Sequence, residues 1–227
     1  MDFCGKPVRS RSKYASDVKR QCFMPTGHSG KCHEFPYLAH LDRVAPKVAD
    51  KIVRDSTMTT GASWKSADAG PNRILRWVML RSDEELRKLG IDMKGLKPQV
   101  VAKLREKAAD YASCMAVAKT LTAAAYSMPN APEAPKPIAE YLAACGMPIV
   151  PHTTRCLVCR GLLDFKLFAE AKRGKAEIET SHSNPRLHRP DNVGFAHRAC
   201  NIAKGNKTLD EFYDWIKEIL RATSRCD

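Results

Sequence analysis

Two short cysteine and histidine pairs constrain the fold of this chain more strongly than any other feature of its sequence. Cys156 and Cys159 form the first pair in "CLVC", and His197 and Cys200 form the second in "HRAC", with 37 residues between the pairs. A gap of two residues lets both side chains of a tight turn reach one ion, and three thiolates with one imidazole are a known tetrahedral zinc set. The spacing therefore predicts a structural zinc site that joins the two segments. The alternative is that one pair is a coincidence of small buried residues.

The charge of the chain points to a polyanionic partner. Its 227 residues include 38 Lys and Arg against 25 Asp and Glu, which gives a formal net charge of +13. Nucleic acid is the first candidate for such a partner, although a membrane surface also attracts basic proteins. Apolar residues at 44% and charged residues at 28% are typical of a chain that buries a core, which excludes a globally disordered protein.

Nine cysteines in a chain without a visible export signal favour metal ligation over a disulfide framework. Their number is odd, and the start of the sequence, "MDFCGKPVRS", lacks the apolar stretch of a secretory signal. No stretch approaches the roughly 18 apolar residues that a membrane-spanning helix needs. We therefore expect a cytoplasmic protein with no membrane partner.

The first 35 residues form a basic, cysteine-bearing segment that is too polar to bury a core of its own. A second zinc ion would order this segment, because zinc binding is what folds many small domains. The alternative is a flexible arm with unligated thiols. The proposed ligands of this zinc knuckle are Cys4, Cys22, His28 and Cys32, with His33 as a competing imidazole, and the basic residues expected to contact DNA are Arg9, Arg11 and Lys13.

The middle region, residues 36–128, is predicted to be mainly helical and to take part in DNA recognition. Apolar residues recur there at steps of three and four, which is the period of an amphipathic helix. Four prolines then fall within residues 129–137, which predicts a stiff linker and a domain boundary. The expected helices are 35–55 with a break at Pro46, 82–89 with an N-cap at Ser82, and 98–127; Arg73 and Arg76 are candidate DNA contacts between them.

The last predicted domain, residues 138–227, contains both zinc pairs. A short helix over 138–145 is followed by an extended segment that ends in an exposed His182 and then by a loop with two prolines. Thr208 and Glu211 form a capping box that opens a final amphipathic helix. The core face of that helix is expected to be Leu209, Phe212, Trp215, Ile216 and Ile219.

The order of these elements resembles the HNH (ββα-metal) nucleases, among them restriction and phage-encoded enzymes. The match rests on His182, Asn192 and Asn201, together with the four zinc ligands, and covers residues 156 to about 208. The resemblance implies an α+β fold that is mainly helical overall. In it a carboxyl-terminal ββα-metal module with structural zinc follows the helical middle region and the small zinc knuckle.

The resemblance also implies roles for individual residues. His182 would be the general base that activates a water, Asn201 would bind a catalytic Mg or Mn ion, and Asn192 would hold the loop to the active site. Lys204 would contact phosphate oxygens. The chain departs from the family at Ser181, where most members have an Asp or His that binds the catalytic metal. A hydroxyl is a weak ligand for such an ion, so Glu179 or His188 is the candidate substitute.

These features together predict a metal-dependent, site-specific endonuclease that acts on double-stranded DNA. Cutting both strands with one active site per chain implies a homodimer. A second hypothesis, from another class, is a zinc-dependent DNA-binding protein that keeps an HNH-like fold without activity. A third is an RNA-directed nuclease, which would share the chemistry and differ in its partner.

Overall fold

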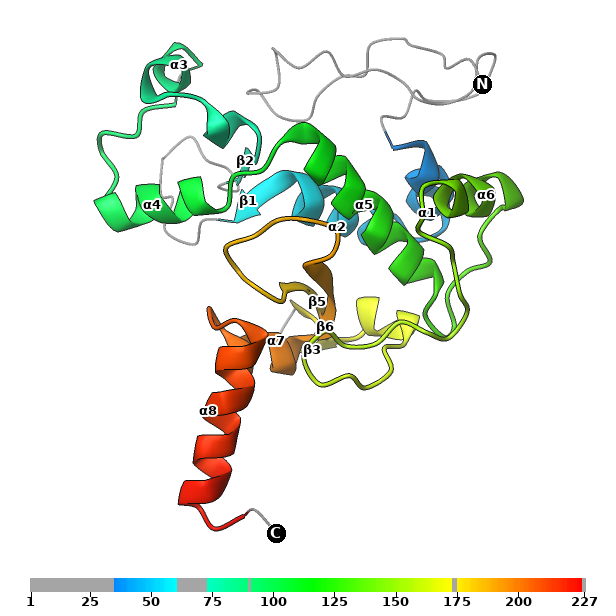
Figure 1. The fold of residues 1–227 in the computed structure, drawn as a ribbon. Helices are drawn as coiled ribbons and strands as arrows, with labels where there is room; N and C mark the ends of the chain where they lie inside the picture. The colour runs from blue at the N-terminus through cyan, green and yellow to red at the C-terminus, as the bar shows by residue number, and fades with distance from the viewer. Residues whose placement is uncertain (1–34, 61–72, 90, 173–174, 226–227) are drawn as a thin grey trace, which may run out of the picture.

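The computed structural model describes residues 35–60, 73–89, 91–172 and 175–225, and in these residues the protein is an α+β fold dominated by helices (Figure 1). The described strands form three small antiparallel sheets of two strands each. No described helix has both the length and the apolar character needed to cross a bilayer. The predicted zinc knuckle and its basic residues, from Cys4 to His33, lie outside the described residues.

Residues 35–60 and 73–89 fold as a run of short elements. Pro46 breaks the first predicted helix as expected, because proline cannot donate the backbone hydrogen bond that a continuous helix needs, and it begins the next helix instead. Ser82 and Glu85 form a complete capping box, which confirms the predicted N-cap. The elements are η1 (Pro36–Leu38), α1 (Ala39–Val44), α2 (Pro46–Thr57), β1 (Met58–Thr60), β2 (Arg73–Leu75), η2 (Val78–Leu80) and α3 (Asp83–Lys88).

The single helix predicted over 98–127 is wrong, because the structure has two helices there. They are α4 (Pro98–Glu106) and α5 (Tyr111–Tyr126), and a short loop separates them. The carboxylate of Asp110 accepts a hydrogen bond of 2.8 Å from the backbone N–H of Ser113. An aspartate in this position satisfies the free donors at the start of a helix, so it begins α5 afresh.

Helix α5 lies at the centre of the molecule, and one apolar core extends from it into the carboxyl-terminal region (Figure 1). Leu121 and Tyr126 of α5 belong to the same buried cluster as Leu142, Ile178 and Phe195. The proline-rich residues 129–137 therefore run between two parts of one packed core, and α6 (Lys136–Ala144) begins inside them. A second buried cluster lies under β2, α3 and α4, and Met115 packs against both clusters.

The carboxyl-terminal region has the chain order strand, strand, helix. Strand β5 (Ile178–His182) pairs antiparallel with β6 (Val193–His197), so that Ile178 lies opposite His197 and His182 opposite Val193. Helix α7 (Arg198–Lys204) follows β6 without a break. Three smaller elements precede this unit: η3 (Phe165–Phe168), β3 (Ala171–Lys172) and β4 (Lys175–Ala176).

The last helix, α8 (Leu209–Ala222), begins at the predicted capping box, since Thr208 and Glu211 exchange both hydrogen bonds. Its predicted core face is only partly correct. Leu209 and Phe212 are buried, but the other three residues of that face are exposed because α8 projects away from the body after its first turns (Figure 1). These exposed residues are Trp215, Ile216 and Ile219.

Candidate active site and metal centre

The fold brings the two predicted zinc pairs together. The ligand atoms of Cys156, Cys159, His197 and Cys200 all lie within 4.8 Å of one another. The Sγ atom of Cys159 lies 3.4 Å from Nδ1 of His197, and the Sγ atom of Cys200 lies 4.0 Å from that same nitrogen. His197 ends β6 and Cys200 lies in the first turn of α7, and both lie beside the turn that contains Cys156 and Cys159. This Cys3His set is suited to a tetrahedral zinc ion.

Asn192 holds the loop that connects β5 to β6. Its side chain is 6% exposed, and its Oδ1 accepts a hydrogen bond of 2.8 Å from the backbone N–H of Asn184. Its Nδ2 donates to the backbone carbonyls of Asn184 at 2.8 Å and of Leu187 at 2.6 Å. Three partly buried hydrogen bonds of one side chain therefore fix the loop that carries His188.

His182 is partly buried rather than exposed, because a chain of hydrogen bonds draws it toward the helical region. Its Nε2 lies 3.1 Å from Nδ1 of His188, and Nε2 of His188 lies 2.6 Å from the backbone carbonyl of Ser56. That carbonyl only accepts, so Nε2 of His188 carries the proton and Nδ1 of His188 is a free acceptor. His182 then donates through Nε2, which leaves the lone pair of its own Nδ1 available.

Both imidazoles are neutral. Burial, followed by the positive charge of Arg76 and the proximity of His188, lowers the pKa of His182 to about 3. Burial and the charge of Arg76 likewise lower the pKa of His188 to about 3. The neutral form of His182 leaves the lone pair of Nδ1 available as an acceptor.

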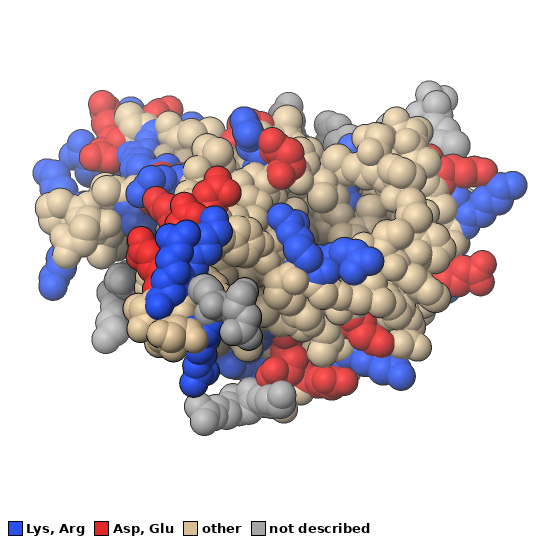
Figure 2. Space-filling model, turned by 60° about the horizontal axis from the view of Figure 1, so that its bottom comes forward, with Lys and Arg blue, Asp and Glu red and all other residues tan. Residues whose placement is uncertain are grey.

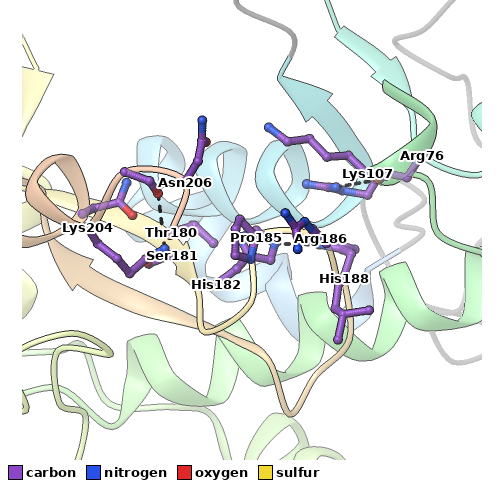
Figure 3. A pocket seen from close by; sticks show the side chains of 13 residues that line it. Arg76, Lys107, Thr180, Ser181, His182, Pro185, Arg186, His188, Lys204 and Asn206 are labelled. Atoms are coloured by element: carbon purple, nitrogen blue, oxygen red, sulfur yellow. Dashed lines mark hydrogen bonds between the residues drawn. The ribbon is translucent and has the colours of Figure 1, made fainter. Parts of the chain in front are cut away.

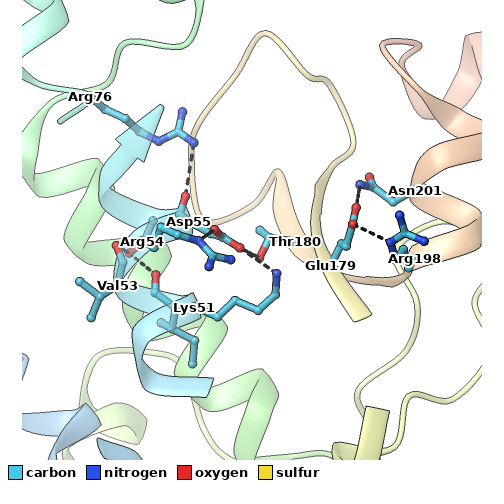
Figure 4. Close-up of polar contacts among 11 residues, drawn as sticks. Lys51, Val53, Arg54, Asp55, Arg76, Glu179, Thr180, Arg198 and Asn201 are labelled. Atoms are coloured by element: carbon cyan, nitrogen blue, oxygen red, sulfur yellow. Dashed lines mark hydrogen bonds and ion pairs between the residues drawn. The ribbon is translucent and has the colours of Figure 1, made fainter. Parts of the chain in front are cut away.

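Asn201, on α7, is joined to Glu179 on β5. The Nδ2 of Asn201 donates a hydrogen bond of 2.7 Å to Oε2 of Glu179, and Oε1 of Glu179 lies 3.3 Å from Nε of Arg198 (Figure 4). Because the amide nitrogen of Asn201 faces Glu179, its Oδ1 remains free to bind a cation. Asn201 and His182 line the same cavity of about 260 Å³, as the predicted site requires.

Asp55, near the end of α2, lines the same cavity of about 260 Å³. Its Oδ2 accepts hydrogen bonds from Thr180 of β5 at 2.9 Å and from Lys51 at 3.0 Å, and its Oδ1 pairs with Arg54 at 2.7 Å (Figure 4). Burial alone would raise the pKa of the Asp55 carboxyl. The charges and hydrogen bonds of Lys51 and Arg54 together have a larger effect in the opposite direction, so the pKa lies below its ordinary value. Asp55 is therefore an ionised carboxylate that ties α2 to β5.

A second cavity, of about 180 Å³, shares His182, Asn201 and Arg76 with the first (Figure 3). Ser181 lines only the second cavity. Its side chain is 1% exposed, and its hydroxyl has no hydrogen-bond partner among the described residues. The hydroxyl of Ser181 thus lies at this cavity with an unused donor and acceptor.

Arg76 follows β2 and brings a buried positive charge to both cavities. It is 5% exposed, and its guanidinium donates to the backbone carbonyls of Lys107 at 2.9 Å and Asp55 at 3.3 Å. No carboxylate among the described residues lies within ion-pair distance of it, and its Nε has no partner there. Burial lowers the pKa of Arg76 to about 10, so the group remains charged at neutral pH.

Two of the other predicted DNA contacts have different outcomes. Lys204, the predicted phosphate contact, is 2% exposed and lines the second cavity with His182, and its ammonium donates to the carbonyls of Lys207 at 2.9 Å and Gly205 at 3.3 Å. Its charge is used mainly to close the end of α7, where the last carbonyls of a helix lack partners. Arg73 has its backbone in β2, and its side chain lies outside the described part of the chain.

Sequence reasoning missed the residues that α2 contributes. Thr180 and Asp55 are 125 residues apart, and His188 and Ser56 are 132 residues apart. No local pattern links such distant positions. His188 was recognised only as a substitute metal ligand, whereas its nitrogens are bonded to His182 and to the backbone of Ser56.

Comparison with known proteins identifies the family of this chain. None of the curated proteins compared with it matches. A solved structure described as a type II restriction endonuclease is 42% identical and superimposes with a TM-score of 0.80, and the match covers 100% of both chains. The profile of the DraIII family matches residues 34–200, which include β5, β6 and most of the zinc and histidine site. The chain therefore belongs to the DraIII family.

Proposed function

We propose that this protein is a metal-dependent endonuclease of the restriction type, which cleaves double-stranded DNA with an HNH (ββα-metal) active site. One observation carries the proposal: His182, whose Nε2 lies 3.1 Å from His188, lines the same cavity as Asn201, Glu179 and the buried guanidinium of Arg76. These groups supply a base, oxygen ligands and positive charge. The likeness to a type II restriction endonuclease over the full chain supports DNA as the substrate.

The donor set at the cavity fits a hard divalent cation such as Mg or Mn. Glu179 supplies a carboxylate and Asn201 a carboxamide oxygen, and Mg is commonly bound by one or two carboxylates and completed by water and phosphate oxygens. Ser181 supplies at most a weak hydroxyl ligand. When bound, the cation would stabilise the negative charge that develops on the phosphate and on the leaving oxygen.

The side chains of the site have complementary tasks in phosphodiester hydrolysis. His182 accepts a proton from the attacking water at Nδ1, because its Nε2 is engaged with His188. Arg76 attracts the scissile phosphate, since a buried cation without a carboxylate partner is stabilised by an incoming anion. A zinc ion bound by the Cys3His set would tie the junction of β6 and α7 to the turn of Cys156 and Cys159, and so would help to position Asn201.

Cleavage of both DNA strands requires two such sites, because each chain has one. We therefore propose a homodimer in which each copy cuts one strand. The second candidate function, a DNA-binding protein without activity, is favoured by the absence of the usual metal-binding Asp or His at Ser181.

The metal requirement tests the proposal and separates it from the second candidate. Supercoiled plasmid incubated with the protein and Mg or Mn is expected to become linear, because both strands are cut. With EDTA the plasmid should stay supercoiled, while a gel-shift assay still detects binding. Binding without cleavage in every divalent metal would support the DNA-binding protein, and cleavage that survives EDTA would contradict the metal dependence. Parallel incubations with single-stranded DNA and RNA test the substrate.

His188 is expected to act as a positioning residue for His182. Replacing it with leucine removes the acceptor at Nδ1, so His182 is free to adopt the wrong tautomer, and kcat should fall by about 10- to 100-fold, the usual effect of an outer-shell partner. His188→Asn restores an acceptor oxygen near that position and should recover most of the activity. The tautomer of His182, observed by ¹⁵N NMR, should change in the leucine variant and not in the asparagine variant.

The matched control for this experiment is His40→Leu. His40 makes a comparable contact, with Nδ1 3.1 Å from the hydroxyl of Tyr126, but it lines neither cavity. Equal losses of kcat in His40→Leu and His188→Leu would mean that both act only through stability.

A further inference from the structure

The outer part of α8 presents an apolar face that no described residue of the chain covers. Every residue from Asp214 to Arg225 is exposed. Four large apolar side chains lie in this part, and their exposed fractions are 40% for Trp215, 37% for Ile216, 41% for Ile219 and 37% for Leu220. The helix projects from the body into open space (Figure 1).

Only the first turns of α8 are anchored. Leu209 and Phe212 are buried in the core, and the hydroxyl of Tyr213 donates to the backbone carbonyl of Val158. Beyond them, Trp215 is touched by the ring of Phe212, with centroids 6.1 Å apart, and by the ammonium of Lys207, 4.7 Å from the ring centroid. The other large apolar residues of this face, Ile216, Ile219 and Leu220, are exposed.

An uncovered helix of this kind needs a partner. Isolated helices shorter than about 12–15 residues are marginal in water, and most helices in proteins are stabilised by packing of their apolar face. Steps of three and four residues place Phe212, Ile216 and Ile219 in one row, with Trp215 and Leu220 on its two sides. A contiguous apolar patch with a charged rim is typical of a protein interaction site.

The charges along α8 indicate which partner fits. Its first half has three acidic residues and no basic one: Asp210, Glu211 and Asp214. Its second half, with the residues that follow as far as Arg225, has three basic residues and one acidic one: Lys217, Arg221 and Arg225, with Glu218. One pair, Lys217 and Asp214, forms an ion pair of 2.9 Å within the helix. Two copies of α8 packed antiparallel place each acidic half beside a basic half, whereas parallel packing opposes like charges.

This charge pattern disfavours DNA as the occupant. A polyanion would meet the acidic half of the helix and be repelled by it. Figure 2, which brings the end with the projecting α8 toward the viewer, shows basic and acidic side chains interspersed rather than one basic surface.

We propose that α8 is a self-association surface, which packs antiparallel against α8 of a second copy of this chain around a two-fold axis. Such a contact is isologous, since each copy contributes the same apolar row and the same two charged halves. The inference deepens the proposed function by assigning the surface of the homodimer. It is tested without DNA, so a failure of the catalytic proposal and a failure of this one give different results.

The mass of the full chain in solution is the first test. Sedimentation equilibrium should give two chains of 25.3 kDa each for the wild type. The double variant Ile216→Asp with Ile219→Asp should sediment as one chain, with its zinc content unchanged. The control, Val44→Asp with Leu80→Asp, alters two other exposed apolar residues, at 48% and 58% exposure, and should remain a dimer. A monomeric wild type, or a dimer that survives the double variant, would overturn the proposal.

Charge reversal tests the antiparallel orientation. Asp210→Lys with Asp214→Lys makes the first half basic, and Lys217→Glu with Arg221→Glu makes the second half acidic, while Glu211 is kept for its capping box. Each pair of changes alone should weaken the dimer about tenfold or more, because like charges then face each other. An equimolar mixture of the two variants should associate as tightly as the wild type at low ionic strength.

A chain with all four reversals separates antiparallel from parallel packing. In antiparallel packing, the basic first half of each helix again lies beside the acidic second half of the other. This chain should therefore associate more tightly than a chain that carries only one of the two pairs of changes. Circular dichroism must show that α8 is still helical, since basic residues in the first turn oppose the helix dipole. Association as weak as that of the half-reversed variants, with helicity retained, would refute the antiparallel arrangement.

Discussion

Replacing His182 with alanine is expected to lower the rate of DNA cleavage by about 10²- to 10⁴-fold, the usual contribution of a general base. The side chain has one free nitrogen, Nδ1, because its Nε2 is bonded to His188. Its loss removes the group that takes the proton from the attacking water. The affinity for DNA should change little, since the neutral imidazole adds no charge to the cavity.

Single-turnover rates at saturating protein, with a gel-shift assay on the same duplex, measure the two effects separately. Added imidazole is expected to recover part of the rate in His182→Ala, because the substitution leaves space at the cavity that His182 lines. Cleavage at the wild-type rate by His182→Ala would show that another group is the base. A loss of binding as large as the loss of rate would show that the residue acts through the fold.

Replacing Cys159 with serine is expected to cause the largest loss of stability. Cys159 is exposed, so the change itself disturbs little packing, and its effect comes through the metal. Structural zinc contributes roughly 10 kcal/mol or more to folding in zinc-finger peptides, and weakening the site should therefore lower the unfolding temperature sharply. Helix α7 carries both Cys200 and Asn201, so cleavage should be lost together with the zinc.

Zinc content by atomic emission and thermal unfolding by circular dichroism provide the measurements. Cys145→Ser is the control, because Cys145 belongs to no metal-ligand cluster among the described residues. Cys159→Ser should contain one zinc fewer per chain than this control. If the knuckle of Cys4, Cys22, His28 and Cys32 also binds zinc, the wild type contains two ions and Cys159→Ser keeps one. An unchanged zinc content and unfolding temperature in Cys159→Ser would exclude a structural zinc at this cluster.

Features with a local sequence signal were predicted correctly. The clustering of Cys156, Cys159, His197 and Cys200 follows from the spacing of the two pairs, and the capping boxes at Ser82 and Thr208 follow from residue type. The single helix predicted over 98–127 was wrong because the apolar repeat continues across the loop between α4 and α5. Asp110 caps the start of α5, so a new helix begins there. Periodicity also cannot say which molecule covers an apolar face, so Trp215 was assigned to the core although it is exposed.

The environment of His182 could not be predicted, for a physical reason. Every residue has a backbone carbonyl, so the sequence does not show that the carbonyl of Ser56 is the acceptor for His188. Arg76 was predicted only as a DNA contact, and its burial at both cavities depends on the packing of β2 against the rest of the fold.

The end of α2 has a consequence for how this nuclease could be dissected or re-engineered. Two neighbouring residues there are joined to the strand–strand–helix unit, Ser56 through His188 and Asp55 through Thr180. This unit therefore depends on α2 for two of its contacts. Excised from the helices that precede it, or grafted onto a new scaffold, it would keep His182 and His188 and still lack the carbonyl of Ser56 that fixes the tautomer of His188 and, through it, that of His182.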